Sequence, residues 1–150
     1  MKPIIGVIGF GLCDAETASQ AEEVGSLIAG SDAVLVCGGL GGVMEAACRG
    51  AVENGGETIG IIPSSDINDA NPWVTIPVAT DMGHARNIII AHTAQALIAL
   101  QGGHGTLTEV YISLKLSKPV ICLGQWAQIS GVLIAHTPKE AVEIAISSIN

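Results

Sequence analysis

The sequence predicts an α/β fold: a single Rossmann-like domain whose doubly wound parallel sheet has helices on both faces. Short β-branched runs alternate with longer segments of helical period along the 150 residues. Most of the short runs are continuously apolar, as strands buried on both faces must be. No linker, charge run or internal repeat divides the chain, so we expect one domain over residues 1–150.

The expected elements follow in a regular order. Strands are expected at Ile4–Ile8, Ala33–Cys37, Thr58–Ile62, Val74–Val78, Ala96–Leu100 and Val120–Leu123. Helices are expected at Glu16–Ala29 with Gly30 as its C′ residue, Val43–Asn54, Gly83–Thr93, Thr106–Leu116, and after the capping box Thr137-Pro138-Lys139-Glu140. The polar segment Ser64–Trp73 is expected to be a surface loop, with a role as a lid left open. Right-handed crossovers between parallel strands would place ligands beyond the strand carboxyl ends.

Charge and hydropathy argue against several partners. The formal net charge is −8, which repels polyanions at long range and disfavours binding to nucleic acid or anionic membranes. The most apolar stretch, Ile88–Leu100, is too short and too polar to span a bilayer. The N-terminal residues run into strand-like sequence without a signal-peptide pattern, so we expect a cytoplasmic protein.

The cysteines and histidines predict no metal centre, and we expect no required cofactor. No C-x-x-C spacing occurs among the four cysteines, which we interpret as buried reduced thiols. They are Cys13, Cys37, Cys48 and Cys122. Three histidines lack the spacing of metal ligands, and we expect their rings to be hydrogen-bonded within the protein or to face solvent. They are His84, His92 and His136.

The turn after the first strand only partly matches a dinucleotide-binding fingerprint. Gly9 and Gly11 supply Gly-x-Gly, but Asp14 stands where the third glycine is needed. The second strand ends Cys37-Gly38, without the acidic residue that binds a ribose 2′-hydroxyl. We therefore do not expect NAD, and the absence of Gly-Lys-Ser/Thr argues against a P-loop.

Two further glycine-rich turns join an apolar strand to a helix. The second turn, Gly38-Gly39-Leu40-Gly41-Gly42, either lets backbone amides approach a ligand or is simply a tight turn. The third, Gly102-Gly103-His104-Gly105-Thr106, opens a helix whose free amides make an anion site. We expect the third turn to bind the phosphate end of a nucleotide-like ligand.

Two charged residues accompany these turns. Glu109 would lie one helical turn beyond the phosphate, where it addresses the sugar or ring of the ligand or is a solvated helix residue. Arg86, beside His84 and Asn87, is a scarce cation that suits a ligand or carboxylate. A structural ion pair or a subunit contact is the alternative for Arg86.

Three sequence blocks together resemble the LOG superfamily, most of all its short molybdenum-cofactor-carrier-like branch. The blocks are Gly38-Gly39-Leu40-Gly41-Gly42-Val43-Met44-Glu45-Ala46-Ala47, Gly83-His84-Ala85-Arg86-Asn87 and Gly102-Gly103-His104-Gly105-Thr106-Leu107-Thr108-Glu109. The resemblance implies a Rossmann-like homodimer or homotetramer. The LOG enzymes hydrolyse the N-glycosidic bond of nucleoside 5′-monophosphates, so the resemblance implies this activity as well. It assigns Arg86 and Glu109 as the residues that act at the ribose.

The chain departs from the enzymes of that superfamily at four places. Gln101 stands where they have Pro, Thr108 where they have Glu, Asn87 where they have Lys, and Glu45 where they have Gly. These departures move toward the carrier-like branch, whose members bind a phosphorylated pterin without turning it over.

Three functions stay open on this basis. The first is a carrier or binding protein for a molybdopterin-type cofactor or a purine nucleotide, and the second is a nucleoside 5′-monophosphate phosphoribohydrolase. A sensor or scaffold is a third candidate. The expected ligand-binding residues are Gly9, Gly11, Gly38, Gly39, Gly41, Gly42, Met44, Arg86, Asn87, Gly102, Gly103, His104, Gly105, Thr106 and Glu109. Whether Phe10, Trp73 or Trp126 stacks on a ring is left open.

Overall fold

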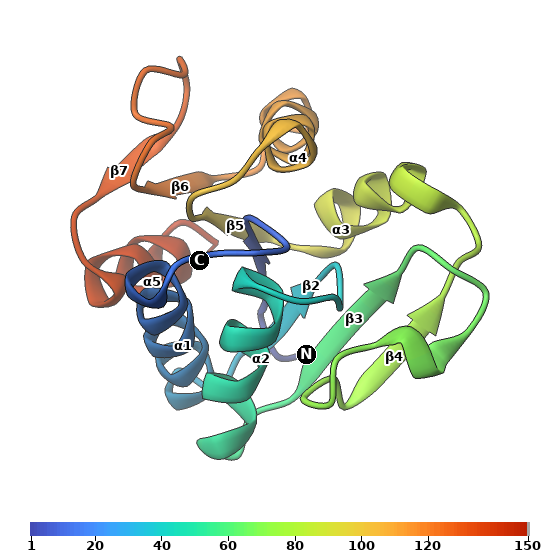
Figure 1. The fold of residues 1–150 in the computed structure, drawn as a ribbon. Helices are drawn as coiled ribbons and strands as arrows, with labels where there is room; N and C mark the ends of the chain where they lie inside the picture. The colour runs from blue at the N-terminus through green and yellow to red at the C-terminus, as the bar shows by residue number, and fades with distance from the viewer. Residues whose placement is uncertain (150) are drawn as a thin grey trace.

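The computed structural model describes residues 1–149 and has the predicted doubly wound α/β architecture. One entirely parallel sheet has the strand order β4-β3-β2-β1-β5-β6-β7 (Figure 1). The strands are β1 (Ile4–Ile8), β2 (Val34–Cys37), β3 (Thr58–Ile62), β4 (Ile76–Ala79), β5 (Ala96–Ala99), β6 (Val120–Leu123) and β7 (Leu133–Ala135). The chain order reverses between β1 and β5, which creates a crevice at their carboxyl ends.

Helices cover both faces of the sheet (Figure 1). One face carries α1 (Ala15–Gly30), α2 (Val43–Glu53) and α5 (Pro138–Ser147), and the other carries α3 (Asn87–Thr93) and α4 (His104–Lys115). Two short 3-10 helices, η1 (Ile67–Asp69) and η2 (Gly83–Arg86), complete the list. Alternate strand residues point to opposite faces, so the buried apolar side chains form two clusters. Leu35 and Ile98 lie in the cluster under α1, α2 and α5, and Val36 and Leu97 lie in the other.

The N-terminus of α1 explains the residue that breaks the dinucleotide fingerprint. Asp14 is the N-cap of α1, and its Oδ1 accepts a hydrogen bond of 2.8 Å from the Thr17 amide. At the other end, the expectation that Gly30 is the C′ residue is wrong. The helix includes Gly30, Ser31 is its C-cap, and Asp32 adopts the left-handed conformation with φ of 53°.

Some element boundaries also differ from the prediction. The expected single helix over residues 83–93 begins as η2 and becomes α-helical only at Asn87. Helix α4 begins at His104 rather than Thr106, so Thr106 lies inside its first turn. Strand β4 starts two residues later than expected, and the short edge strand β7 was not predicted. Leu133 and Ile134 of β7 are exposed, so this strand lacks the buried apolar pattern of the inner strands.

The connection at residues 64–73 is a surface segment with its own local structure. Asp66 caps η1, and Ser64 hydrogen-bonds to Asp69. Its far end is fastened to the turn after β2, because Asn71 donates its amide N–H to Gly39 O and its Nδ2 to Leu40 O, both at 2.9 Å. Whether this segment acts as a lid stays a prediction.

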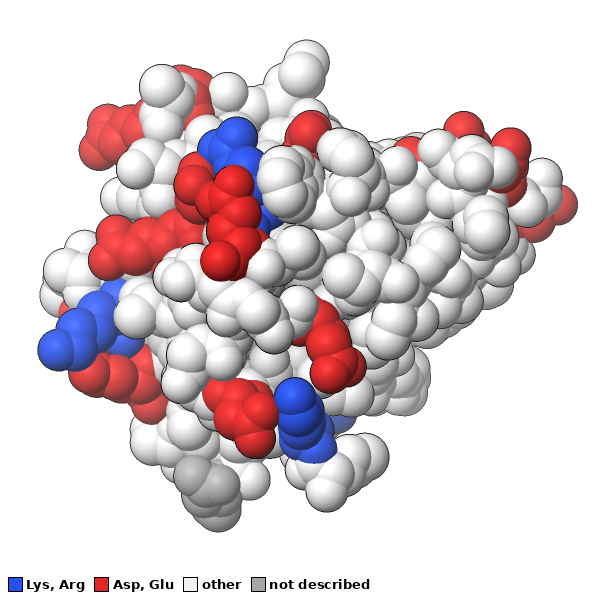
Figure 2. Space-filling model, turned by 90° about the horizontal axis from the view of Figure 1, so that it is seen from below, with Lys and Arg blue, Asp and Glu red and all other residues white. Residues whose placement is uncertain are grey.

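The surface carries the acidic excess of the sequence. Figure 2 shows acidic side chains among a few basic ones on a largely uncharged face. Within residues 1–149, no helix is long and apolar enough to cross a membrane. All four cysteines are free thiols; three are buried as expected, and Cys13 is half-buried.

Candidate ligand-binding site

A cavity of about 240 Å³ lies at the carboxyl edge of the sheet, beside the switch between β1 and β5. Its walls come from the loop after β1 and from the N-terminal ends of α2, η2, α3 and α4. The lining residues are Gly9, Phe10, Gly11, Met44, His84, Arg86, Asn87, Gly103, Gly105, Thr106 and Glu109. The parallel sheet brings these segments together because every strand carboxyl end meets at the same edge.

The first turn of α4 presents backbone donors to the cavity. Gly103 is the N-cap, and the first intrahelical hydrogen bond runs from the Leu107 amide to Gly103 O at 3.0 Å. The amides of His104, Gly105 and Thr106 therefore precede the hydrogen-bonded part of the helix. Together with the helix dipole, they favour an anion at this end.

Arg86 is buried and held in a fixed position at the cavity wall. Its Nε donates to Ile61 O at 2.8 Å, its Nη2 to Gly38 O at 3.4 Å, and its Nη1 to Asn87 Oδ1. A guanidinium has five N–H groups, so two remain for a ligand after these three bonds. Burial lowers the pKa of Arg86, and the nearby Glu109 carboxylate opposes that effect. The side chain is a preorganised cation with little freedom to move.

Glu109 lines the same cavity and is only 6 % exposed. The alternative of a solvated helix residue is therefore wrong, because α4 turns this position inward. Burial raises the pKa of Glu109 to about 8, and the positive charge of Arg86 partly opposes the rise. Within residues 1–149, no group donates a hydrogen bond to its carboxyl. At neutral pH the carboxyl group is mostly protonated, so it can donate a hydrogen bond into the cavity.

The structure brings nine of the fifteen expected ligand-binding residues to the cavity wall, and six lie outside it. The residues that line the wall are Gly9, Gly11, Met44, Arg86, Asn87, Gly103, Gly105, Thr106 and Glu109. Those outside it are Gly38, Gly39, Gly41, Gly42, Gly102 and His104. His104 is exposed at the start of α4, where its carbonyl accepts a bond from Thr108 Oγ1. A ligand role for these six stays a prediction.

The glycines of the second turn have packing roles. A Cβ on Gly38 would lie 2.5 Å from Arg86 Nη2 and 2.8 Å from Met44 Sδ, so only glycine lets these two lining residues approach. Gly42 has φ of 63°, and a Cβ there would overlap the Phe10 carbonyl oxygen, which accepts the Val43 amide. The second turn supports the cavity from behind rather than lining it.

Two lining residues were absent from the sequence-based set. Phe10 is 41 % exposed and stands at the mouth of the cavity, where its ring can face a ligand ring. His84 is also exposed at the mouth, and its position two residues before Arg86 was the only signal for it. Trp126 is buried, and its Nε1 donates to Leu100 O at 2.7 Å. Trp73 packs against the core under α1, α2 and α5, so neither tryptophan lines the cavity.

The side-chain chemistry of the site is that of an anion site with one ionisable acid. Among residues 1–149, no three His, Cys, Asp or Glu side chains come together in a way that could hold a metal ion. The positive elements are Arg86 and the amides at the start of α4, and both belong to the cavity wall. Fold and cavity together define a doubly wound α/β protein whose topological switch carries a pocket lined by one arginine, one buried carboxyl group and a helix N-terminus.

Comparison with known proteins gives the family. The model of the SLOG cluster4 family matches residues 2–148, and the chain belongs to this family. The molybdenum cofactor binding protein from Rippkaea orientalis has a similar structure, with 39% identity, a TM-score of 0.95, and coverage of 100% of this chain and 99% of the other. The molybdenum cofactor carrier protein from Chlamydomonas reinhardtii is 35% identical, with a TM-score of 0.91 and 99% coverage of both chains.

The comparisons also reach the enzymes of the superfamily. A cytokinin riboside 5′-monophosphate phosphoribohydrolase from Mycobacterium tuberculosis is 33% identical over 132 residues, which are 79% of this chain and 68% of that protein. The resemblance to the LOG superfamily and its molybdenum-cofactor-carrier-like branch is therefore confirmed.

Proposed function

We propose that the protein is a carrier or binding protein for a phosphorylated, pterin-type ligand such as the molybdenum cofactor. The observation that carries the proposal is the convergence of a helix N-terminus, a fixed arginine and a buried carboxyl group on one cavity. The similarity to molybdenum cofactor binding and carrier proteins at 35–39% identity over the whole chain supports this ligand class.

The phosphate end of the ligand belongs at the first turn of α4. Its oxygens would accept hydrogen bonds from the amides of residues 104–106 and from the two remaining N–H groups of Arg86. Local donors of this kind are needed because the net charge of −8 gives no long-range attraction for a phosphate.

The remainder of the ligand extends toward the mouth of the cavity. A volume of about 240 Å³ is smaller than the roughly 300–1,000 Å³ typical of pockets that enclose a whole ligand. The phosphate and the adjoining ring fit inside, and the heterocycle lies against Phe10. The protonated Glu109 carboxyl donates a hydrogen bond to a ligand oxygen, a role that suits binding better than water activation.

Two measurements test this proposal. Native mass spectrometry of freshly purified protein should show a co-purified phosphorylated ligand that is lost on denaturation. In calorimetry with AMP as a simple phosphorylated probe, Gly103→Val should weaken binding, because a Cβ at Gly103 would lie 3.1 Å from Phe10 Cε1 and crowd the amides. Gly30→Val is the matched control, since a Cβ at Gly30 meets no atom within 4 Å. Equal AMP affinity in the Gly103 variant would mean that the phosphate site lies elsewhere.

Hydrolysis of a nucleoside 5′-monophosphate is the second candidate function. Arg86 and Glu109, the two residues assigned to the ribose by the resemblance, both line the cavity. Incubation with AMP and chromatography for free adenine tests this function. Adenine release that Glu109→Gln abolishes and Glu16→Gln preserves would establish it, and the absence of adenine would rule it out for this substrate.

A further inference from the structure

Two thiols face each other directly behind the cavity wall. Cys37 is the last residue of β2, Cys48 lies in α2, and their sulfur atoms are 3.5 Å apart. Both residues are 0 % exposed and belong to the apolar cluster under α1, α2 and α5. Within residues 1–149, neither Cys13 nor Cys122 has a second sulfur at hydrogen-bond distance. The pairing is therefore specific to Cys37 and Cys48.

We propose that Cys37 and Cys48 are a redox-active dithiol that a peroxide oxidises to a disulfide, and that the disulfide weakens ligand binding in the adjacent cavity. The sulfur atoms would have to approach by about 1.5 Å, from contact to the roughly 2.05 Å of an S–S bond. Such a shift is within reach of side-chain rotation and a small movement of the end of β2.

Each of the two thiols affects the acidity of the other. The hydrogen bond that Cys37 shares with Cys48 and the burial of Cys37 raise the pKa of the Cys37 thiol well above its usual value. The same hydrogen bond, helped by Asn71 and Thr58, lowers the pKa of the Cys48 thiol. Attack on a peroxide by either thiol leads to the same disulfide; with Cys48 as the first nucleophile, Cys37 is the thiol that resolves the oxidised intermediate.

The reaction balances with hydrogen peroxide as the oxidant. The Cys48 thiolate attacks one peroxide oxygen, the O–O bond breaks, and the leaving hydroxide takes up a proton to become water. The resulting Cys48 sulfenic acid is then attacked by Cys37 sulfur. The S–O bond breaks, its hydroxyl leaves with the Cys37 proton as a second water, and the S–S bond forms.

The segment at residues 64–73 is hydrogen-bonded to the backbone that directly follows Cys37. Its Asn71 is hydrogen-bonded through its backbone and side chain to Gly39 and Leu40, which directly follow Cys37. The Asn71 side chain also contributes to lowering the pKa of the Cys48 thiol. Because both thiols are fully buried, a peroxide needs a local opening to reach them, and the proposal places this opening at the segment that carries Asn71. Asn71→Ala should therefore speed oxidation.

The coupling to the cavity runs through Gly38. The Gly39 amide donates to Cys37 Sγ at 3.3 Å, and the Gly38 carbonyl accepts from Arg86 Nη2. Arg86 and Met44 pack so closely on Gly38 that a shift of the backbone there must move both. Both residues line the cavity, so the disulfide would displace groups proposed to hold the ligand.

Peptide mapping tests the disulfide independently of any ligand. The full-length protein is treated with hydrogen peroxide, alkylated, and cleaved after Glu residues, which separates residues 24–45 with Cys37 from residues 46–53 with Cys48. The expected product is a cross-link of these two peptides that a reductant removes. It should form in Cys13→Ser and Cys122→Ser, form faster in Asn71→Ala, and be absent in Cys48→Ser. Oxidation confined to Cys13, or no cross-link in the wild type, would overturn the proposal.

Calorimetry with AMP tests the coupling, which rests on the proposed function. Oxidised protein should bind AMP at least ~10-fold more weakly than reduced protein, while Cys48→Ser binds equally before and after peroxide. Equal affinity of the oxidised and reduced wild type would refute the coupling. Failure of the reduced protein to bind AMP would count against the phosphate site instead, because the cross-link is established by mass alone.

Discussion

Glu109 is the residue whose environment differs most from what its type suggests. It is a buried carboxyl group with one cation nearby, and its pKa is raised from 4.5 to about 8. The folded protein thus keeps a proton that the unfolded chain loses at lower pH. Burial of Glu109 therefore lowers the free energy of unfolding at pH values where its carboxyl is ionised in the unfolded chain but still protonated in the folded protein.

Replacement of Glu109 by Gln should change how stability depends on pH. The wild type should lose about 2–4 kcal/mol of unfolding free energy between pH 4.5 and 8 through this group, and no more above pH 8. Glu109→Gln has no proton to lose, so it should gain on the wild type as pH rises through this window. Urea denaturation at pH 5 and pH 8 measures the effect, with Glu16→Gln as the control. A parallel pH dependence of wild type and Glu109→Gln would contradict the raised pKa.

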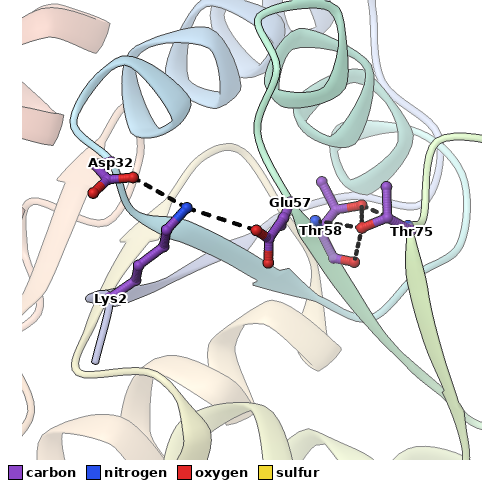
Figure 3. A network of polar contacts seen from close by, with 5 residues as sticks. All are labelled: Lys2, Asp32, Glu57, Thr58 and Thr75. Atoms are coloured by element: carbon purple, nitrogen blue, oxygen red, sulfur yellow. Dashed lines mark hydrogen bonds and ion pairs between the residues drawn. The ribbon is translucent and has the colours of Figure 1, made fainter.

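Thr58 is a second residue whose role depends on its partners. It is buried, its Oγ1 donates to Trp73 O at 2.7 Å, and it exchanges hydrogen bonds of 2.9 Å with Thr75 (Figure 3). Lys2, Asp32 and Glu57 form an exposed ion-pair chain in the same view (Figure 3). The threonine pair joins β3 to the segment before β4 at the amino end of the sheet.

Thr58→Val should destabilise the protein by about 1–3 kcal/mol, because the isosteric side chain leaves the Trp73 carbonyl and the Thr75 amide without their partner. Thr108→Val is the control, since Thr108 is exposed and bonds only within α4. Chemical denaturation compares the two. An equal effect of both changes would mean that the network adds nothing beyond an ordinary helix hydrogen bond.

At the scale of elements, the helix N-termini divide into capped and uncapped ones. Asp14 caps α1 and Thr137 caps α5, whereas Gly42 and Gly103 at α2 and α4 provide no side-chain cap. Helix α3 also lacks a side-chain cap, and all three uncapped α-helices begin beside the cavity. The Val43 amide of α2 bonds to Phe10 O, so the free amides that we expect a ligand to use are those at the start of α4.

The cap of α5 gives a prediction at this scale. Thr137 Oγ1 accepts from the Glu140 amide at 3.1 Å, and Glu140 Oε2 accepts from the His136 amide at 2.7 Å. Thr137→Ala should lower the unfolding free energy by about 1 kcal/mol, and Thr137→Ser should restore most of it. Thermal unfolding of the two variants measures the difference. A Ser variant as unstable as the Ala variant would show that the hydroxyl is not the stabilising group.

At the scale of the whole molecule, one face stays incompletely covered. Ile76 and Val78 of β4 are paired with Ile59 and Ile61 of β3, so they point to the face that carries α3 and α4. Both are exposed. Ile88 of α3 and Tyr111 of α4 are exposed apolar side chains as well. We expect these exposed apolar side chains to pack against a second copy of the chain, since exposed apolar surface is a common feature of symmetric contacts.

The expected homodimer or homotetramer should therefore depend on this face. The substitution Val78→Asp or Tyr111→Asp should reduce the mass measured by light scattering to that of one chain. Each substitution would place two carboxylates opposite each other across a symmetric contact. Ser26→Asp on α1 is the control and should keep the assembly. A wild-type protein that is already monomeric would disprove the assembly, and an unchanged mass in both variants would place the contact elsewhere.

The amino-acid sequence predicts the fold class, which the structure confirms, and it also predicts a phosphate end of the site, which stays a prediction. Continuous apolar runs that alternate with segments of helical period favour strands buried on both faces, and a glycine-rich turn before a helix favours free amides at the helix N-terminus. The tertiary structure decided the strand order. It also decided that Glu109 points inward and that Phe10 and His84 line the cavity. These depend on which loops meet at the carboxyl edge of the sheet. The second turn shows the limit, because its glycines resemble a ligand loop locally but pack against Arg86, Met44 and the loop after β1. Local sequence determines which groups are available, and long-range packing determines which of them face the cavity.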